Sequence, residues 1–165
     1  MAPLLSFLLR PSLPMWKFCL AAFPLALFPS LALFGGVLFL FSAAGVDTSS
    51  IQPPSRSATA GEVFGSVIFA PVVETYLLAL ILRGLLKATT RPLLAATASA
   101  VVWGAFHGLF APLWFFGSVW SFFVFSCAFI GWQERSFKQA YIAAAVPHAL
   151  INLTVIATVA LENAA

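Results

Sequence analysis

Residues 63–86 read VFGSVIFAPVVETYLLALILRGLL, and this stretch decides the fold class of the protein. A helix of about 20 apolar residues crosses the ~30 Å hydrocarbon core of a bilayer, so the stretch is long enough to be a transmembrane helix. Glu74 lies near its middle. Because a charged side chain at the bilayer centre costs about 2.5–3.5 kcal/mol on insertion scales, we expect Glu74 to face a protein interior or a water-filled cavity.

The rest of the chain has the same membrane-protein composition. Of its 165 residues 62% are hydrophobic and only 8% are charged, against roughly 25% charged residues in soluble domains. Further apolar runs of spanning length cover residues 18–41, 93–110, 113–130 and 140–161. We therefore predict an all-α, polytopic transmembrane helical bundle with about five spans, forming a single membrane domain over residues 1–165.

The basic residues predict how the helices are oriented. If all five runs cross the membrane, every Lys and Arg except Arg56 falls on one side, which places the N-terminus in the cytoplasm. Residues 42–61, rich in Ser, Thr, Pro and Ala, then form a mobile extracytoplasmic loop. The first run is too long for a signal-peptide core and is expected to remain as an anchor, whereas Met1–Leu9 either lies along the membrane interface or is disordered. The basic residues on the predicted cytoplasmic side are Arg10, Lys17, Arg83, Lys87, Arg91, Arg135 and Lys138.

The two shorter apolar runs and the two cysteines also fit a transmembrane helical bundle. The runs 93–110 and 113–130 are joined by Ala111-Pro112 and should form a tight helical hairpin, with Gly104 and Gly108 as a small-residue seam for close helix packing. Cys19 and Cys127 lie within apolar runs without CxxC spacing, which predicts small buried side chains. Basic residues scattered singly at helix ends give no indication of a nucleic-acid partner.

Polar side chains within the predicted spans are the candidate functional residues. His148 and Asn152 are spaced i, i+4 and point the same way from the last helix. Pro147 leaves the carbonyl of Ala143 without its helical donor, so we expect a bend there. His107 stands near the end of the third helix. Taken alone, His148 and Asn152 are also explained as an interhelical contact and His107 as an interfacial residue. Together with Glu74 they can form one pocket holding a general base and hydrogen-bond donors.

Several catalytic classes are excluded by the residues present. The chain has no pair of membrane-embedded aspartates, no HExxH sequence and no GxSG sequence, so the corresponding aspartate, zinc and serine proteases are excluded. No metal or cofactor is predicted. As the alternative, Glu74, His107 and His148 have the residue types of a His₂Glu zinc site, although their spacing does not require one.

The polar residues also stand in motifs. The chain resembles the CPBP family of intramembrane proteases (CAAX-protease and bacteriocin-processing, also called abortive-infection), whose motifs EExxxR, FxxxH and HxxxN or HxxxD lie on separate membrane helices. The corresponding stretches are Glu74-Thr75-Tyr-Leu-Leu-Ala79, Trp103-Gly-Ala-Phe-His107 and His148-Ala-Leu-Ile-Asn152. The last matches fully. Thr75 replaces the second glutamate, Ala79 the arginine and Trp103 the phenylalanine.

The resemblance, over roughly Val63–Ile156, implies an intramembrane endopeptidase. It implies that Glu74 activates a water, that His107 holds this water, and that His148 and Asn152 donate hydrogen bonds to the oxyanion. The substrate would be a membrane protein or peptide, cut in CAAX-like processing, bacteriocin processing or sorting-tail removal. We expect an integral protein of a bacterial inner (plasma) membrane.

Two other functions remain open from the residues alone. A non-catalytic immunity or binding protein of the same fold would use the polar cluster to recognise a partner. A small proton-coupled carrier would use Glu74 and the histidines as a relay, although no inverted repeat is visible in the sequence. Neither the substrate nor the oligomeric state follows from the sequence.

Overall fold

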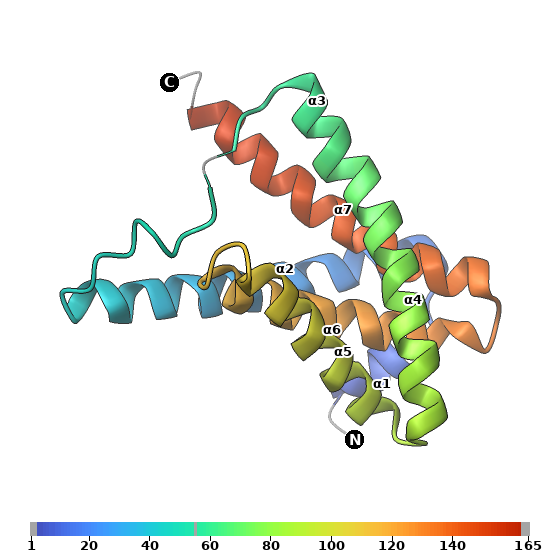
Figure 1. Ribbon diagram of the computed structural model, residues 1–165. Helices are drawn as coiled ribbons and strands as arrows, with labels where there is room; N and C mark the ends of the chain where they lie inside the picture. The colour runs from blue at the N-terminus through green and yellow to red at the C-terminus, as the bar shows by residue number, and fades with distance from the viewer. Residues whose placement is uncertain (1–2, 55, 163–165) are drawn as a thin grey trace.

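The computed structural model describes residues 3–54 and 56–162, and all regular elements in this part of the chain are helices (Figure 1). Met1, Ala2, Ser55 and residues 163–165, which belong to the predicted N-terminal segment, loop and domain, lie outside the described residues. The helices are α1 (Pro3–Leu9), α2 (Met15–Ala43), α3 (Ala60–Val63), the π-helix η1 (Phe64–Phe69), α4 (Ala70–Ala88), α5 (Pro92–Gly108), α6 (Trp114–Gln133) and α7 (Phe137–Glu162).

The predicted all-helical membrane bundle is confirmed. Four helical runs are long and apolar enough to cross a membrane, namely Met15–Ala43, Ala60–Ala88, Trp114–Gln133 and Phe137–Glu162. The second of these joins α3, η1 and α4 without a break. The predicted run 93–110 corresponds to α5, which has 17 residues and is about 25 Å long at 1.5 Å per residue. The chain leaves α5 at Gly108, so α5 is shorter than the other four runs.

The central element is α6, around which the other helices pack. In its apolar window 56% of the residues are buried, against 17% in α2, 28% in the run Ala60–Ala88 and 33% in α7. The predicted hairpin with α5 is confirmed: a Cβ at Gly104 would lie 3.1 Å from atoms of Phe115 and Val119, and one at Gly108 3.3 Å from Phe115. Both predicted buried cysteines, Cys19 and Cys127, lie in the core.

The short helix α1 packs against α6 and α2. Leu8 is fully buried, and the ring of Phe7 stacks on that of Phe18 with centroids 5.0 Å apart. Gly131 of α6 faces α1 so closely that a Cβ there would collide with the carbonyl oxygen of Leu8. The described part of the N-terminal segment is therefore a packed helix.

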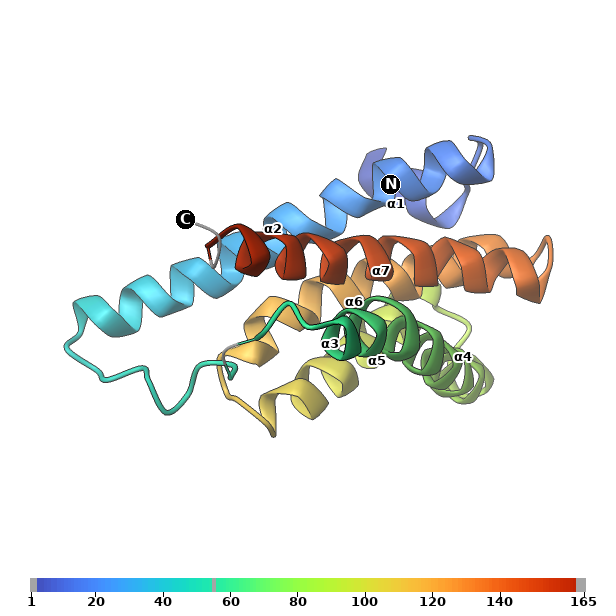
Figure 2. The ribbon, with the colours of Figure 1, turned by 90° about the horizontal axis from the view of Figure 1, so that it is seen from above.

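The first half of α2 is packed in the bundle and the second half is not. Its buried residues lie between Phe18 and Ser30, and the end near Ala43 projects beyond the other helices in two perpendicular views (Figures 1 and 2). Large apolar side chains such as Phe39, 71% exposed, cover this half. In a membrane such side chains face lipid, for which apolar surface is suited.

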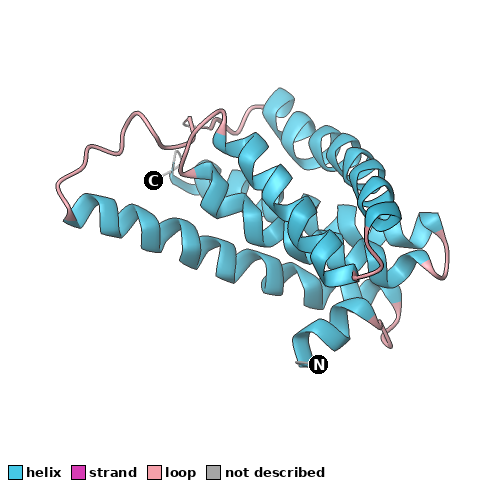
Figure 3. Ribbon diagram, turned by 60° about the horizontal axis from the view of Figure 1, so that its bottom comes forward, coloured by secondary structure: helices cyan, strands magenta, loops and turns pink. Residues whose placement is uncertain are grey.

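The segment between α2 and α3 returns over the end of the α5–α6 hairpin (Figure 3). Gly45, at φ 73°, ends α2, a conformation that glycine adopts without steric cost. The Ser49 N–H donates to Asp47 Oδ1 at 2.9 Å and holds the pKa of that carboxyl below its usual range. The Leu113 N–H donates to the Ile51 carbonyl at 3.0 Å. The predicted extracytoplasmic loop is thus tied to the start of α6.

Candidate functional site

Three of the predicted site residues converge from three different helices. Glu74 lies on α4, His107 near the end of α5 and His148 next to Pro147 on α7, within a helix that continues through the proline. The Nε2 atoms of His107 and His148 lie 3.9 Å and 3.8 Å from Glu74 Oε2. Their side chains are 22% exposed for Glu74, 13% for His107 and 8% for His148, so the cluster is mostly enclosed by protein.

The two imidazoles differ in their second nitrogen. His107 Nδ1 lies 2.9 Å from the carbonyl oxygen of Trp103. Because a carbonyl only accepts hydrogen bonds, Nδ1 carries a proton, and in the neutral form of the ring Nε2 then presents its lone pair to Glu74. His148 Nδ1 is buried and has no hydrogen-bond partner among the described residues.

Aromatic rings hold both imidazoles in place. Phe125 stacks on His148, with centroids 5.0 Å apart and an interplanar angle of 21°. Trp114 meets His107 edge-on at 5.1 Å. Phe122 contacts both rings, at 5.2 Å from His107 and 5.4 Å from His148, and stacks on Trp103 at 4.7 Å. These contacts restrict ring rotation, so the Nε2 atoms remain directed toward Glu74.

The cluster lines a cavity of about 490 Å³ between α2, α6, α7 and the helix that carries Glu74. Its wall contains buried polar atoms that have no partner within the described part of the chain, including Glu74 Oε2 and Ser30 Oγ. Buried polar groups in proteins are normally satisfied by protein or by water. The cavity therefore suits water and a polar ligand.

Arg56, from the segment between α2 and α3, also lines the cavity. Its Nη1 donates to Ser66 Oγ at 3.1 Å, and its guanidinium lies over the Trp114 ring at 5.5 Å. The sequence singles out Arg56 only as the basic residue predicted to lie on the opposite side of the membrane from the other seven. Ser66, Trp114 and Phe122 are not identified as cavity residues from the sequence, because no short motif includes them.

Asn152 lines the same cavity but its amide is engaged with the backbone. Its Nδ2 donates to the carbonyl oxygen of Ser66 at 2.7 Å. In the π-helix the Ala70 N–H donates to Gly65 O, five residues back. The next donor in this register would be Pro71, which has no N–H. Asn152 thus supplies the hydrogen bond that Pro71 cannot make. The structure does not bring Asn152 into an interaction with Glu74 that would parallel those of the histidines.

None of the three motif positions that depart from the CPBP pattern, Thr75, Ala79 and Trp103, lines this cavity. Thr75 is buried, at 2% exposed. Ala79 lines a separate groove, together with Arg83. The substitutions at these positions therefore leave the lining of the Glu74 cavity unchanged.

The three-residue cluster lacks the arrangement of a metal centre. Among the described residues no group of three or more His, Cys, Asp and Glu side chains is placed to hold a metal ion. The zinc alternative at Glu74, His107 and His148 therefore has no support from the geometry.

No protein-family model, curated protein or solved structure matches the chain. The cavity and the motif residues that line it are therefore the features of the chain that bear on its function.

Proposed function

We propose that the protein is an intramembrane endopeptidase of the glutamate type, cleaving a peptide bond of a membrane-associated protein or peptide. One observation carries the proposal: Glu74 Oε2 lies 3.9 Å and 3.8 Å from the Nε2 atoms of two histidines at the wall of a cavity within the helical bundle. These distances are too long for direct hydrogen bonds, which are about 2.7–3.2 Å for N–H···O. They suit one water bound between the three side chains.

The hydrogen-bond capacities of the three groups match the activation of that water. The carboxylate of Glu74 and Nε2 of His107 both accept, so together they hold the two hydrogens of the water and leave its lone pairs free for attack. As the water oxygen bonds to the peptide carbonyl carbon, Glu74 takes up one proton. When the C–N bond breaks, Glu74 returns this proton to the leaving amine.

His148 has the complementary role of a donor. With Nδ1 unpartnered among the described residues, its proton resides on Nε2, where it can donate to the oxyanion of the tetrahedral intermediate. A single preorganised donor of this kind is worth about 10²–10³ in rate. The second oxyanion donor implied by the motif, Asn152, has one amide hydrogen engaged with Ser66 O and one left for this role.

The motif resemblance supports the same chemistry and its setting. The order Glu74, then His107, then the full match His148-xxx-Asn152 follows the CPBP pattern. CAAX-like processing, bacteriocin processing and sorting-tail removal are the corresponding activities, in the inner (plasma) membrane of a bacterium. These belong to the proposal and depend on the resemblance.

The test compares the termini of membrane proteins in cells that express the wild type, Glu74→Gln or Glu134→Gln. Glu134→Gln makes the same chemical change at an exposed residue outside the cavity. We expect termini produced by cleavage in cells that express the wild type or Glu134→Gln. In cells that express Glu74→Gln their abundance should fall at least a hundredfold, since general-base catalysis contributes a factor of about 10²–10⁴ to the rate.

Undiminished cleavage by Glu74→Gln would refute the mechanism. A phenotype that survives Glu74→Gln without any cleavage would favour a binding or immunity protein. Uptake driven by a proton gradient in liposomes, lost in Glu74→Gln, would instead indicate a carrier.

A further inference from the structure

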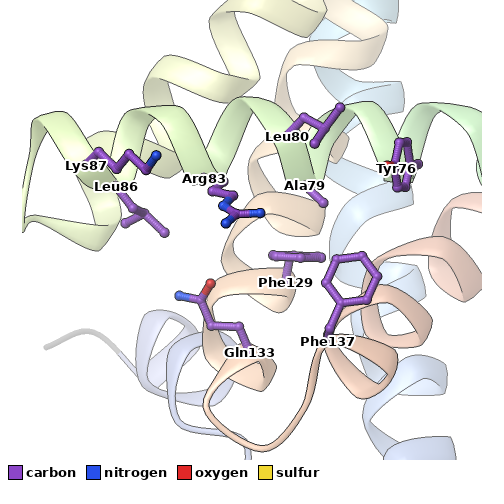
Figure 4. Close-up of a pocket in the computed structure, with 9 residues that line it drawn as sticks. All are labelled: Tyr76, Ala79, Leu80, Arg83, Leu86, Lys87, Phe129, Gln133 and Phe137. Atoms are coloured by element: carbon purple, nitrogen blue, oxygen red, sulfur yellow. The ribbon is translucent and has the colours of Figure 1, made fainter.

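A second hollow, of about 680 Å³, lies between α4 and the turn from α6 to α7, and it takes no part in the proposed reaction (Figure 4). Arg83 and Lys87 of α4 form one side and Gln133 of α6 faces them from the other (Figure 4). Tyr76, Leu80 and Phe137 continue the hollow away from the cations. We call this hollow the α4 groove.

The cations of the α4 groove have no anionic partner among the described residues. Arg83 and Lys87 are spaced i, i+4 and so share one helix face, where like charges repel. The ion pairs among the described residues both involve Glu74, which is in the other cavity. Glu134, which directly follows Gln133 of the groove, lines a different hollow together with Arg10 and Arg135. The groove therefore holds two exposed positive charges that an anion would stabilise.

The other part of the α4 groove is apolar and open. Phe129 forms its floor and is 5% exposed, whereas Tyr76, Leu80 and Phe137 are 54%, 48% and 57% exposed. In a bilayer these exposed side chains face the hydrocarbon. A ligand that fits both parts must have an anionic head and an apolar tail.

The position of the groove matches the place of such a ligand in a membrane. Arg83 and Lys87 stand near the end of α4, in the last part of the spanning run Ala60–Ala88. Basic pockets between transmembrane helices at the membrane surface bind the head groups of anionic lipids. A free phosphate would use the cations but would leave the apolar part of the groove without a function.

We propose that the α4 groove binds one anionic phospholipid, with its phosphate at Arg83, Lys87 and Gln133 and an acyl chain along Leu80, Tyr76 and Phe137. The guanidinium and the ammonium donate to the phosphate oxygens, and the Gln133 amide contributes a neutral donor. The bound lipid fills the space between α4 and the α6–α7 turn. This site is independent of the reaction proposed for Glu74.

Native mass spectrometry of the purified full chain tests the site, using phosphatidylglycerol, phosphatidylcholine with the same acyl chains, and inorganic phosphate as separate probes. We expect one phosphatidylglycerol to bind at least tenfold more tightly than phosphatidylcholine, and phosphate to compete weakly. Arg83→Gln/Lys87→Gln should lose about thirtyfold in phosphatidylglycerol affinity, from about one kcal/mol per cation.

Matched variants separate a defined site from general charge attraction. Arg91→Gln/Lys138→Gln removes two exposed basic residues that do not line the groove, and its affinity should stay within about threefold of the wild type. The charge-conserving Arg83→Lys/Lys87→Arg should retain binding. Equal losses in both Gln pairs, equal affinity for the two lipids, or full competition by phosphate would each overturn the proposal. Should the Arg83→Gln/Lys87→Gln protein fail to fold, the single variants and the lipid preference of the wild type decide it.

Discussion

At the scale of single residues, His107 and His148 present the same ring nitrogen to Glu74 but differ in what holds the other one. The Trp103 carbonyl fixes the proton of His107 on Nδ1. No described residue does so for His148. In the proposed reaction the pair is therefore asymmetric, since Nε2 of His107 accepts and Nε2 of His148 donates. This asymmetry is what a water-activating site needs and what two identical histidines would not provide.

The asymmetry is measurable without a substrate. The chain has two histidines, so nitrogen NMR of protein labelled at histidine should show two rings in different tautomers, His107 with its proton on Nδ1 and His148 with its proton on Nε2. The spectrum of His148→Asn assigns the remaining signal to His107. Two rings in the same neutral tautomer would contradict the assigned roles.

At the scale of the helices, prolines free backbone carbonyls and side chains from neighbouring helices occupy them. Pro29 cannot donate to the Leu25 carbonyl, which instead accepts from Trp120 Nε1 at 2.9 Å. Pro71 likewise leaves the Ser66 carbonyl to Asn152 at 2.7 Å. At Pro29 and Pro71 the freed carbonyl thus becomes a tie between two helices. The second tie fixes the helix of Glu74 against the helix of His148.

A double-mutant cycle tests the tie at Pro71. Asn152→Ala should lower the free energy of unfolding by about 1 kcal/mol, since interhelical hydrogen bonds in membranes average about 0.6 and reach about 1.7 kcal/mol. In a Pro71→Ala background the restored N–H can pair with the Ser66 carbonyl, so the same change should cost much less. Unfolding in mixed micelles measures both.

The cycle also separates structure from catalysis. If Asn152 acts through Ser66 alone, Asn152→Ala/Pro71→Ala should recover cleavage as well as stability. If Asn152 also contacts the oxyanion, stability returns while the turnover rate remains low. Equal destabilisation by Asn152→Ala in both backgrounds would show that Pro71 is not the reason for the hydrogen bond.

At the scale of the whole molecule, the polar cavity and the α4 groove lie toward opposite ends of the bundle. Pro53 and Arg56, from the segment between α2 and α3, line the cavity, whereas Arg83 and Lys87 line the groove. If the clustered basic residues mark the cytoplasmic side, the cavity is nearer the opposite side. We therefore expect the substrate to be cut near the extracytoplasmic surface.

Cysteine labelling in intact cells tests this orientation. Ala58→Cys lies in the segment that also carries Arg56 and should react with a membrane-impermeant maleimide, whereas Lys138→Cys should react only after lysis. The native Cys19 and Cys127 are 3% and 0% exposed, so the wild type gives a low background. The reverse labelling pattern would place the cavity on the cytoplasmic side.

The sequence predicted the helices well and the site in part. Apolar runs located every long helix because a backbone in lipid must satisfy its own hydrogen bonds. The energetic cost of polar side chains in the same runs identified Glu74, His107 and His148. It also identified Asn152, but it did not show that the Asn152 amide donates to the Ser66 carbonyl. Arg56 and Phe122 were missed because no local pattern distinguishes a loop cation that folds into a cavity, or one phenylalanine among 18.

Class of fold and candidate residues follow from composition and local pattern, because the bilayer imposes the same requirement on each segment separately. The distances from Glu74 to the two histidines, the tautomer of His107 and the pairing of Ser66 with Asn152 and Arg56 follow only from tertiary structure. These depend on how α4, α5 and α7 pack around α6. That packing brings together residues far apart in the chain. The periodicity within a single helix does not determine it.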